Sequence, residues 1–269
     1  MDWSGLTCVV VGASSGIGRA AAVAAAGRGA TVLAVARRED RLIELVSELG
    51  GEPHSYVVCD VSDLEQVRSM AAAVAARTTK LDVLINSAGI PGHGPINRTT
   101  PEQAEALIKV NLVSAIWCIQ LLFPLMGHAP RDGRTPVVVN VASMAGRIPL
   151  PGAALYTASK FGLVGFTEAL WGEMQSLGIQ TMAVNPGFVH TEGFPMDHLL
   201  GTPLLRWTVM SPERVGEAIC KGVENRRTEV KVQGWWNAVY LGTVLLGPLR
   251  RRMSRSVWKS TGGRRKARL

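Results

Sequence analysis

The sequence contains few of the residues that build disulfide frameworks or metal sites. It has four cysteines, scattered mostly within apolar runs without a CxxC pair, and five histidines without the spacing of metal ligands. Zinc sites and disulfide frameworks depend on recurring, closely spaced residues of these types. We therefore expect no metal, and buried thiols in the reducing environment of the cytoplasm. The cysteines are Cys8, Cys59, Cys118 and Cys220.

The sequence also lacks features that would divide or export the chain. Neither a Pro/Ser-rich linker nor a repeat of solenoid type interrupts its 269 residues, and 47% of them are hydrophobic, which is ample for one core. The opening residues MDWSGLTCVVVG enter a strand-like run at once, so we expect no signal peptide and no N-terminal anchor. We expect one catalytic domain over residues 1–232 and an extension over residues 233–269.

Acidic residues are absent from the C-terminal tail, and this absence accounts for the net charge of +8. Arg250–Leu269 contains nine Lys/Arg and no Asp/Glu, whereas the other 249 residues carry 20 basic and 21 acidic groups. The body is therefore close to neutral, which argues against a DNA-binding core. We expect no nucleic-acid partner for the tail either, because no groove-reading module accompanies it.

Apolar, β-rich runs alternate with helical patterns along the chain. The expected strands are Thr7–Val11, Thr31–Ala36, Tyr56–Cys59, Leu81–Asn86, Pro136–Ala142, Gln180–Val184 and Thr228–Val232. The expected helices are Gly16–Gly27, Arg38–Leu49, Asp63–Ala76, Pro101–Met126, Ala153–Leu177 and Pro212–Glu224. The strands are continuous apolar runs, as in parallel sheets that helices cover on both faces. The pattern predicts an α/β fold with a single doubly wound, Rossmann-type parallel sheet of about seven strands.

A glycine-rich turn joins the first expected strand to the first expected helix. It reads Gly12-Ala-Ser-Ser-Gly16-Ile-Gly18. Glycines permit a tight turn there and let backbone N–H groups approach a pyrophosphate at the helix N-terminus. Because the turn lies between a strand and a helix, we interpret it as a nucleotide site rather than an ordinary loop.

Two arginines follow the second expected strand, at the position where sites that prefer NAD usually carry an acidic residue. Arg37 and Arg38 precede the first carboxylate, which belongs to Glu39. The planar guanidinium group of arginine suits bidentate contact with a phosphate. We therefore expect NADP(H) rather than NAD(H). The alternative is that both arginines are solvated in the first turn of the following helix.

A serine, a tyrosine and a lysine have the spacing of an acid–base site. Tyr156 and Lys160 are four residues apart in a helical pattern and so share a helix face, and Ser143 lies thirteen residues upstream of Tyr156. A nearby ammonium favours the phenolate and lowers the tyrosine pKa from its usual value of about 10. Ser143 could hold the oxygen of a carbonyl or alcohol beside the phenol. On spacing alone, an exposed lysine and a half-buried tyrosine are the alternative.

In order and spacing, these segments resemble the short-chain dehydrogenase/reductase family over residues 5 to about 232. The resemblance identifies a catalytic tetrad of Asn111, Ser143, Tyr156 and Lys160. The cofactor contacts that it implies, together with those expected from the residues, are Gly12, Ser14, Ser15, Gly16, Ile17, Gly18, Arg37, Arg38, Asp60, Val61, Asn86, Ala88, Gly89, Tyr156, Lys160, Pro186, Gly187, Val189 and Thr191.

Particular roles follow from the same resemblance. Asp60 would contact adenine, and the segment 185–191 would touch the nicotinamide. Two positions depart from the family pattern: Val11 stands where a threonine is usual, and Ser87 where a second asparagine is usual. These departures concern cofactor affinity and leave the catalytic groups in place.

The resemblance also implies a reversible hydride transfer between NADP(H) and a carbonyl or secondary alcohol. Tyr156 would protonate the substrate oxygen while Ser143 hydrogen-bonds it as charge develops. Lys160 would lower the Tyr156 pKa and hydrogen-bond the nicotinamide ribose. Asn111 would position a water that links Lys160 to solvent; the alternative is an asparagine inside a helix that bonds to backbone groups.

The segment 192–210 lies where the family has its variable substrate lid. It is rich in Leu, Phe, Trp and Met, with His198 and Arg206 as its notable polar members. An apolar lid favours a lipophilic substrate of fatty, steroid or isoprenoid-like type, the alternative being packing in a core or subunit interface. Reduction of 3-oxoacyl-acyl-carrier-protein is the alternative reaction, and a catalytically idle nucleotide-sensing protein is the alternative of another class.

The extension combines an apolar run with the basic tail. The fifteen residues 235–249 are mostly apolar and are followed at once by three arginines. As a helix they would extend about 22 Å, less than the hydrocarbon core of about 30 Å. Aromatic residues at one end and arginines at the other suit an element in the membrane interface. We expect residues 235–269 to attach peripherally to an anionic membrane, with packing on the protein or on a partner subunit as the alternative. We also expect a homo-oligomer.

Overall fold

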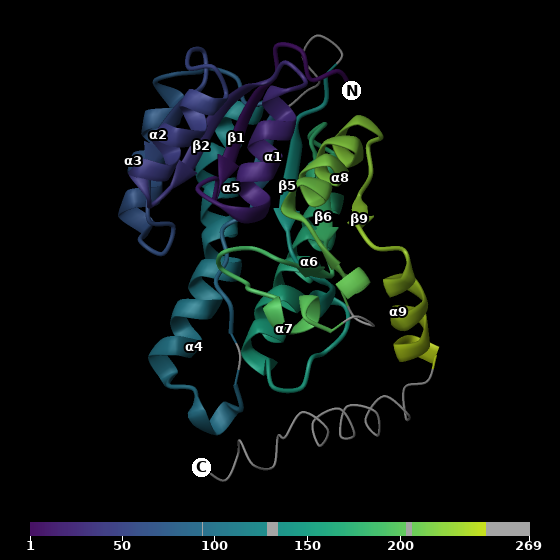
Figure 1. Ribbon diagram of the computed structural model, residues 1–269. Coiled ribbons are helices and arrows are strands. Elements are labelled where there is room, and N and C mark those ends of the chain that lie inside the picture. Colours follow the sequence, from purple (N-terminus) through teal and green to yellow (C-terminus); the bar gives the residue numbers. More distant parts are fainter. Residues whose placement is uncertain (93, 128–133, 203–205, 246–269) are drawn as a thin grey trace.

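The computed structural model describes residues 1–92, 94–127, 134–202 and 206–245, and its centre is a parallel sheet (Figure 1). The strands lie in the order β3-β2-β1-β4-β5-β6-β9, and every neighbouring pair is parallel. They are β1 (Thr7–Val11), β2 (Thr31–Ala36), β3 (Ser55–Val58), β4 (Val83–Asn86), β5 (Val137–Val141), β6 (Gln180–Asn185) and β9 (Glu229–Lys231). This sheet confirms the predicted fold class.

The strand order reverses between β1 and β4. Val11 at the end of β1 is in register with Val35 of β2 on one side and with Asn86 of β4 on the other. The loops that follow β1 and β4 therefore diverge toward opposite faces of the sheet and leave a crevice at its carboxyl edge. Doubly wound sheets bind their ligands at such a switch point.

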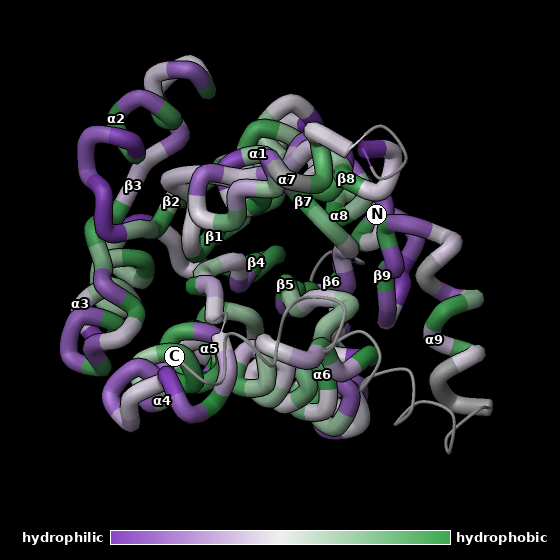
Figure 2. Tube along the Cα trace, turned by 60° about the horizontal axis from the view of Figure 1, so that its bottom comes forward, coloured by the Kyte–Doolittle hydropathy of each residue, from purple (hydrophilic) through white to green (hydrophobic). Residues whose placement is uncertain are grey.

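Helices cover both faces of the sheet. One hydrophobic cluster joins the sheet to α1, α2 and α8, and a second joins the opposite face to α3, α5 and α6. Figure 2 shows the apolar strands between these two layers. The four cysteines are free and buried, as expected. The helices are α1 (Gly16–Ala26), α2 (Glu39–Glu48), α3 (Leu64–Ala75), α4 (Pro101–Ile108), α5 (Ser114–Met126), α6 (Ala154–Gln175), α7 (Asp197–Leu200), α8 (Pro212–Glu224) and α9 (Trp235–Leu245).

The expected helix over residues 101–126 contains a π-helical insertion. The turns of α4 and α5 are separated by a π-helix at Lys109–Val113. A π-helix adds a residue to the turn and redirects the side chains that follow, often at functional sites. By length and composition the run Pro101–Met126 would suffice to cross a membrane. A core helix of a water-soluble protein meets the same criterion, and Cys118 and Leu122 of α5 are fully buried against the sheet.

The segment that resembles a substrate lid is closed at its base by two short strands. β7 (Phe188–Val189) pairs in parallel with β8 (Val209–Met210), so the lid leaves and returns to the body at one place. Gln233 adds a hydrogen bond of 2.7 Å from its side-chain amide to the Thr208 carbonyl oxygen. Residues 203–205 of the lid and the side chain of His198 lie outside what the structure describes.

Helix α9 follows the edge strand β9 and stands to one side of the molecule (Figure 1). Trp235 and Tyr240 pack against a small buried cluster built on Met144 and Ile148. Val239 and Leu241 are 38% and 55% exposed. The part of the expected membrane element beyond residue 245, including the basic tail, lies outside the described residues.

Candidate active site

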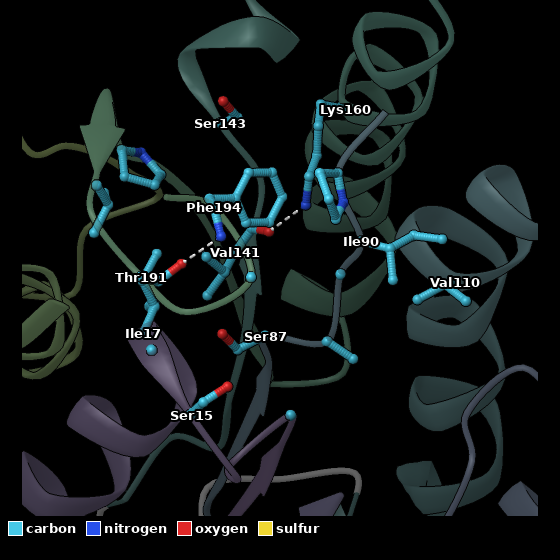
Figure 3. A pocket seen from close by; sticks show the side chains of 18 of the residues that line it. Ser15, Ile17, Ser87, Ile90, Val110, Val141, Ser143, Lys160, Thr191 and Phe194 are labelled. Atoms are coloured by element: carbon cyan, nitrogen blue, oxygen red, sulfur yellow. Dashed lines mark hydrogen bonds between the residues drawn. The ribbon is translucent and has the colours of Figure 1, made fainter. Parts of the chain in front are cut away.

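A cavity of about 500 Å³ opens at the carboxyl edge of the sheet, beside the switch point. Figure 3 shows Ser15, Ile17 and Ser87 around its lower part and Ser143, Lys160 and Phe194 around its upper part. The expected residues that line it are Gly12, Ser14, Ser15, Gly16, Ile17, Arg37, Arg38, Asp60, Val61, Ala88, Gly89, Ser143, Tyr156, Lys160, Pro186, Gly187, Val189 and Thr191. Gly18, Asn86 and Asn111 are expected site residues that do not line the cavity.

The glycine turn is packed so closely that side chains are excluded from it. Gly12 has φ +85°, and a Cβ atom there would lie 2.6 Å from the Ala88 backbone nitrogen. A Cβ atom on Gly18 would lie 2.2 Å from the Gly12 carbonyl oxygen, so glycine at this position allows the turn to close. Ser15 precedes α1 without a side-chain cap, so the N-terminus of α1 can offer its backbone N–H groups to an anion.

Each arginine at the end of β2 faces a carboxylate. Arg37 lies 3.5 Å from Asp60, and Arg38 lies 2.7 Å from Glu192 of the lid. Burial raises the pKa of Asp60, but hydrogen bonds from Ser62 and the charge of Arg37 outweigh it and lower the pKa overall. The expected arginine pair is therefore present at the cavity, and acidic residues balance its charge.

The serine, tyrosine and lysine meet at the other end of the cavity. Ser143 follows β5, while Tyr156 and Lys160 share one face of α6. The Ser143 hydroxyl hydrogen-bonds the Tyr156 phenol and accepts a 3.0 Å hydrogen bond from the Ala145 backbone N–H. The Lys160 ammonium donates a 3.0 Å hydrogen bond to the Val141 carbonyl oxygen (Figure 3). It lies 5.9 Å from the centre of the Tyr156 ring.

The pKa values of these groups differ from the expectation. Burial raises the pKa of the Tyr156 phenol, and the hydrogen bond with Ser143 lowers it only in part. The expected lowering by Lys160 is wrong for this structure, because the Lys160 ammonium is hydrogen-bonded to Val141 and is itself desolvated. Burial lowers the Lys160 pKa to about 8. The phenol is thus held in its protonated form near neutral pH.

Asn111 lies in the π-helix and is fully buried. Its side chain accepts a 2.8 Å hydrogen bond from the Ile90 N–H and donates to the Ile90 carbonyl oxygen at 3.0 Å and to Ser159 at 3.2 Å. This is the arrangement of an asparagine bonded to backbone, the alternative considered from the sequence. Asn111 therefore joins the π-helix to the loop after β4 and to α6, which carries Tyr156 and Lys160.

The side chain of Asn86, which is expected to contact a cofactor, belongs to a buried chain of side chains and does not line the cavity. Its amide donates a 2.9 Å hydrogen bond to Asn140 of β5, and Asn140 donates one of 2.9 Å to Thr167 of α6. These hydrogen bonds link β4 to β5 and α6, so the Asn86 side chain stabilises the structure behind the cavity.

The sequence indicated part of the apolar wall only as segments, the lid and residues 185–191, and not as individual residues. The ring centre of Phe194 lies 5.8 Å from that of Tyr156. The Phe194 N–H donates a 3.1 Å hydrogen bond to the Thr191 hydroxyl (Figure 3). The other lining residues of this kind are Ile90, Val110, Val141, Met144, Ile148, Leu150, Phe188 and Met196. Their signal in the sequence is position alone: Val110 lies in the π-helix, and the others lie at or after strand ends or in the lid.

Comparison with known proteins bears on this site. Residues 6–196 match the protein family described as short chain dehydrogenase. A 3-oxoacyl-acyl-carrier-protein reductase from Thermotoga maritima is 35% identical over 193 residues, which are 71% of this chain and 77% of the relative. A 3beta-hydroxysteroid dehydrogenase from Mediterraneibacter gnavus is 37% identical over 190 residues, 68% of this chain and 66% of the relative.

Solved structures have the same fold. A short chain dehydrogenase/reductase from Burkholderia phymatum in complex with NAD superposes with a TM-score of 0.80 at 23% identity, over 92% of this chain and 96% of the other. The RhlG/NADP active-site complex from Pseudomonas aeruginosa superposes with a TM-score of 0.79 at 22% identity, over 87% and 98%.

Proposed function

The chain belongs to the short-chain dehydrogenase/reductase family of oxidoreductases, and we propose that it transfers hydride between NADP(H) and a carbonyl or secondary alcohol. The observation that carries this proposal is the meeting of Ser143, Tyr156 and Lys160 in the cavity that the glycine turn also lines. A catalytically idle nucleotide-sensing protein would have no need of this acid–base group.

The lower part of the cavity fits a dinucleotide. Close packing around Gly12 and Gly18 brings backbone rather than side chains to the cavity, and the N-terminus of α1 suits a pyrophosphate. Arg37 and Arg38 support NADP(H) as the cofactor, because guanidinium groups can bind a 2′-phosphate. When bound, the dinucleotide supplies or accepts the hydride.

Side chains of the protein would donate the proton and hydrogen-bond the substrate oxygen. Ser143 would hydrogen-bond the substrate oxygen beside the Tyr156 hydroxyl, as a donor to developing negative charge. Because burial raises the Tyr156 pKa, the phenol is protonated and suited to donate its proton to that oxygen. The protonated phenol is the form that reduction of a carbonyl requires. Asn111 would act as a positioning residue through its bonds to Ile90 and Ser159.

The upper wall supports a lipophilic substrate. Phe194, Met196, Ile148 and Leu150 present apolar surface to the cavity near Tyr156. Apolar walls with few polar groups are typical of sites for hydrophobic ligands. A fatty, steroid or isoprenoid-like ketone is our first choice of substrate. A 3-oxoacyl-acyl-carrier-protein is the second, supported by the similarity to the reductase of that name.

Two further proposals concern partners. Exposed Val239 and Leu241 on α9, together with the basic tail, support attachment of a cytoplasmic protein to an anionic membrane surface. Phe161 and Trp171 on α6 are 40% and 39% exposed, which supports a homo-oligomer through that helix.

The test of the proposed reaction is the Tyr156→Phe variant. Removing the hydroxyl should reduce turnover about a hundredfold or more, because the proton donor is lost, while NADPH binding stays within about twofold of wild type. The measurement is NADPH absorbance with a panel of lipophilic ketones and 3-oxoacyl thioesters, which also separates the two substrate classes. Turnover equal to that of wild type would contradict the mechanism.

A further inference from the structure

Arg38 connects the glycine turn to the lid. Its guanidinium donates a 2.7 Å hydrogen bond to Glu192 and longer ones of 3.3 and 3.4 Å to the Ser14 hydroxyl. Ser14, Arg38 and Glu192 all line the cavity. The Arg38–Glu192 pair joins residues 154 positions apart in the chain. It spans the part of the cavity where the sequence places the cofactor's adenosine ribose.

The backbone next to Glu192 is held close to the glycine turn. Its neighbour Thr191 lies so near Gly16 that a Cβ atom on Gly16 would be 3.1 Å from the Thr191 Cγ2 atom. Thr191 also forms an isolated bridge with Phe194. The Glu192 carboxylate is therefore brought to Arg38 by an anchored segment, although its side chain is 59% exposed.

The two arginines differ in how firmly their carboxylates are held. Asp60, which faces Arg37, also accepts hydrogen bonds of 2.9 and 2.8 Å from the N–H and hydroxyl of Ser62. Glu192 lies at the solvent surface, and the hydrogen bond from Arg38 lowers its pKa, so it is ionised at neutral pH. An exposed carboxylate can leave an ion pair at little cost, since water solvates it at once. Of the two arginines, Arg38 is therefore the one whose paired carboxylate another anion can easily replace.

We propose that Glu192 is a specificity-determining residue whose carboxylate competes with the cofactor's 2′-phosphate for Arg38. This inference rests on the proposed NADP(H)-dependent function. NAD(H) carries no 2′-phosphate and leaves the Arg38–Glu192 pair intact. Binding of NADP(H) replaces the carboxylate at Arg38 and frees the first residue of the lid. Glu192 therefore reduces the preference for NADP(H) that the arginines alone would give.

The test compares wild type with Glu192→Gln by calorimetric titration with NADPH and with NADH. Glutamine keeps the size of the side chain and removes the charge, so the Kd for NADPH should fall by about three- to fivefold while that for NADH stays within about twofold. Glu44→Gln is the matched control, because Glu44 is also 59% exposed and pairs with an arginine, Arg41, outside the cavity. It should change neither Kd.

The outcomes of these titrations test the competition between Glu192 and the 2′-phosphate. An unchanged ratio of the two Kd values in Glu192→Gln, or weaker NADPH binding, would overturn the inference. In the Arg38→Ala background, Glu192→Gln should lose its effect, and a persisting effect would also overturn it. Wild-type protein that binds neither nucleotide would instead sink the proposed function itself, so the two failures are distinguishable.

Discussion

The ammonium group of Lys160 lies in the protein interior, 3.0 Å from the Val141 carbonyl oxygen. With its pKa lowered to about 8 by burial, a measurable fraction of this lysine loses its charge in mildly alkaline solution. The neighbouring phenol is shifted the opposite way, to a higher pKa. Both shifts disfavour the charged forms, as burial does for acids and bases alike.

Arg37 provides a test of cofactor choice at the scale of one residue. Its side chain is 66% exposed at the edge of the cavity. Arg37→Ala should weaken NADPH binding by about tenfold, because a charge-assisted phosphate contact is lost, and should change NADH binding by less than about twofold. Fluorescence titration with both nucleotides measures the effect.

The control for this substitution is Arg41→Ala on α2, where the arginine pairs with Glu44 and does not line the cavity. It should leave both affinities unchanged. Wild-type protein that binds NADH more tightly than NADPH would contradict the expected preference.

Residue types and spacing identified most of the cavity but not the contacts between its residues. Tyr156 and Lys160 are close because four residues make one helical turn, which is a local rule. The Arg38–Glu192 pair depends on how the lid returns to the sheet, and the raised Tyr156 pKa depends on burial by residues such as Phe194. Neither depends on local sequence, so neither could be predicted from it.

At the scale of elements, the alternation of strands and helices was predictable, and the π-helix within Pro101–Met126 was not. Apolar periodicity reports which face of a helix is buried, whereas one extra residue in a turn alters that periodicity too little to be seen. The insertion matters because Asn111 lies within it and holds Ile90 and Ser159. The position of Asn86 was unpredictable for a related reason: a polar residue at a strand end can face the core, as its bond to Asn140 shows.

The turn between β1 and α1 gives a prediction about stability. Gly12→Ala places a Cβ atom 2.6 Å from the Ala88 nitrogen in a residue with φ +85°. Strain and overlap together should lower the free energy of unfolding by about 2–4 kcal/mol and weaken NADPH binding. Urea denaturation followed by circular dichroism measures the first effect, and nucleotide titration the second.

Gly5 offers a matched control for this turn. It also has positive φ, +68°, but no atom lies within 4 Å of an added Cβ. Gly5→Ala should therefore show the backbone strain alone, about 1 kcal/mol, with normal NADPH affinity. If both variants lost the same stability, close packing against Ala88 would not be the cause.

At the scale of the whole molecule, the exposed apolar side chains of α9 predict membrane binding. Replacing both Val239 and Leu241 with Asp removes apolar groups and adds negative charge. The full-length variant should bind vesicles of phosphatidylcholine and phosphatidylserine at least about tenfold more weakly than wild type. Vesicle sedimentation measures the bound fraction.

Ile43→Asp is the control, because Ile43 on α2 is 52% exposed and lies on another element. It should bind as wild type does. Vesicles of phosphatidylcholine alone should bind the wild type less, since the basic tail gains attraction only from anionic lipid. Equal binding by wild type and the α9 variant would leave packing on a partner subunit as the role of Val239 and Leu241.

Helix α9 contacts residues of the cavity wall and also has side chains exposed at the molecular surface. Trp235 and Tyr240 pack against Met144 and Ile148, and these two residues also line the cavity. When two binding sites share one deformable wall, binding at one site can change the affinity at the other. Thermodynamic linkage makes this coupling reciprocal. If a substrate moves the wall, it must alter the affinity of α9 for its docking surface by the same factor by which docking alters the affinity for substrate. The enzyme's apparent substrate affinity would then report whether α9 is docked.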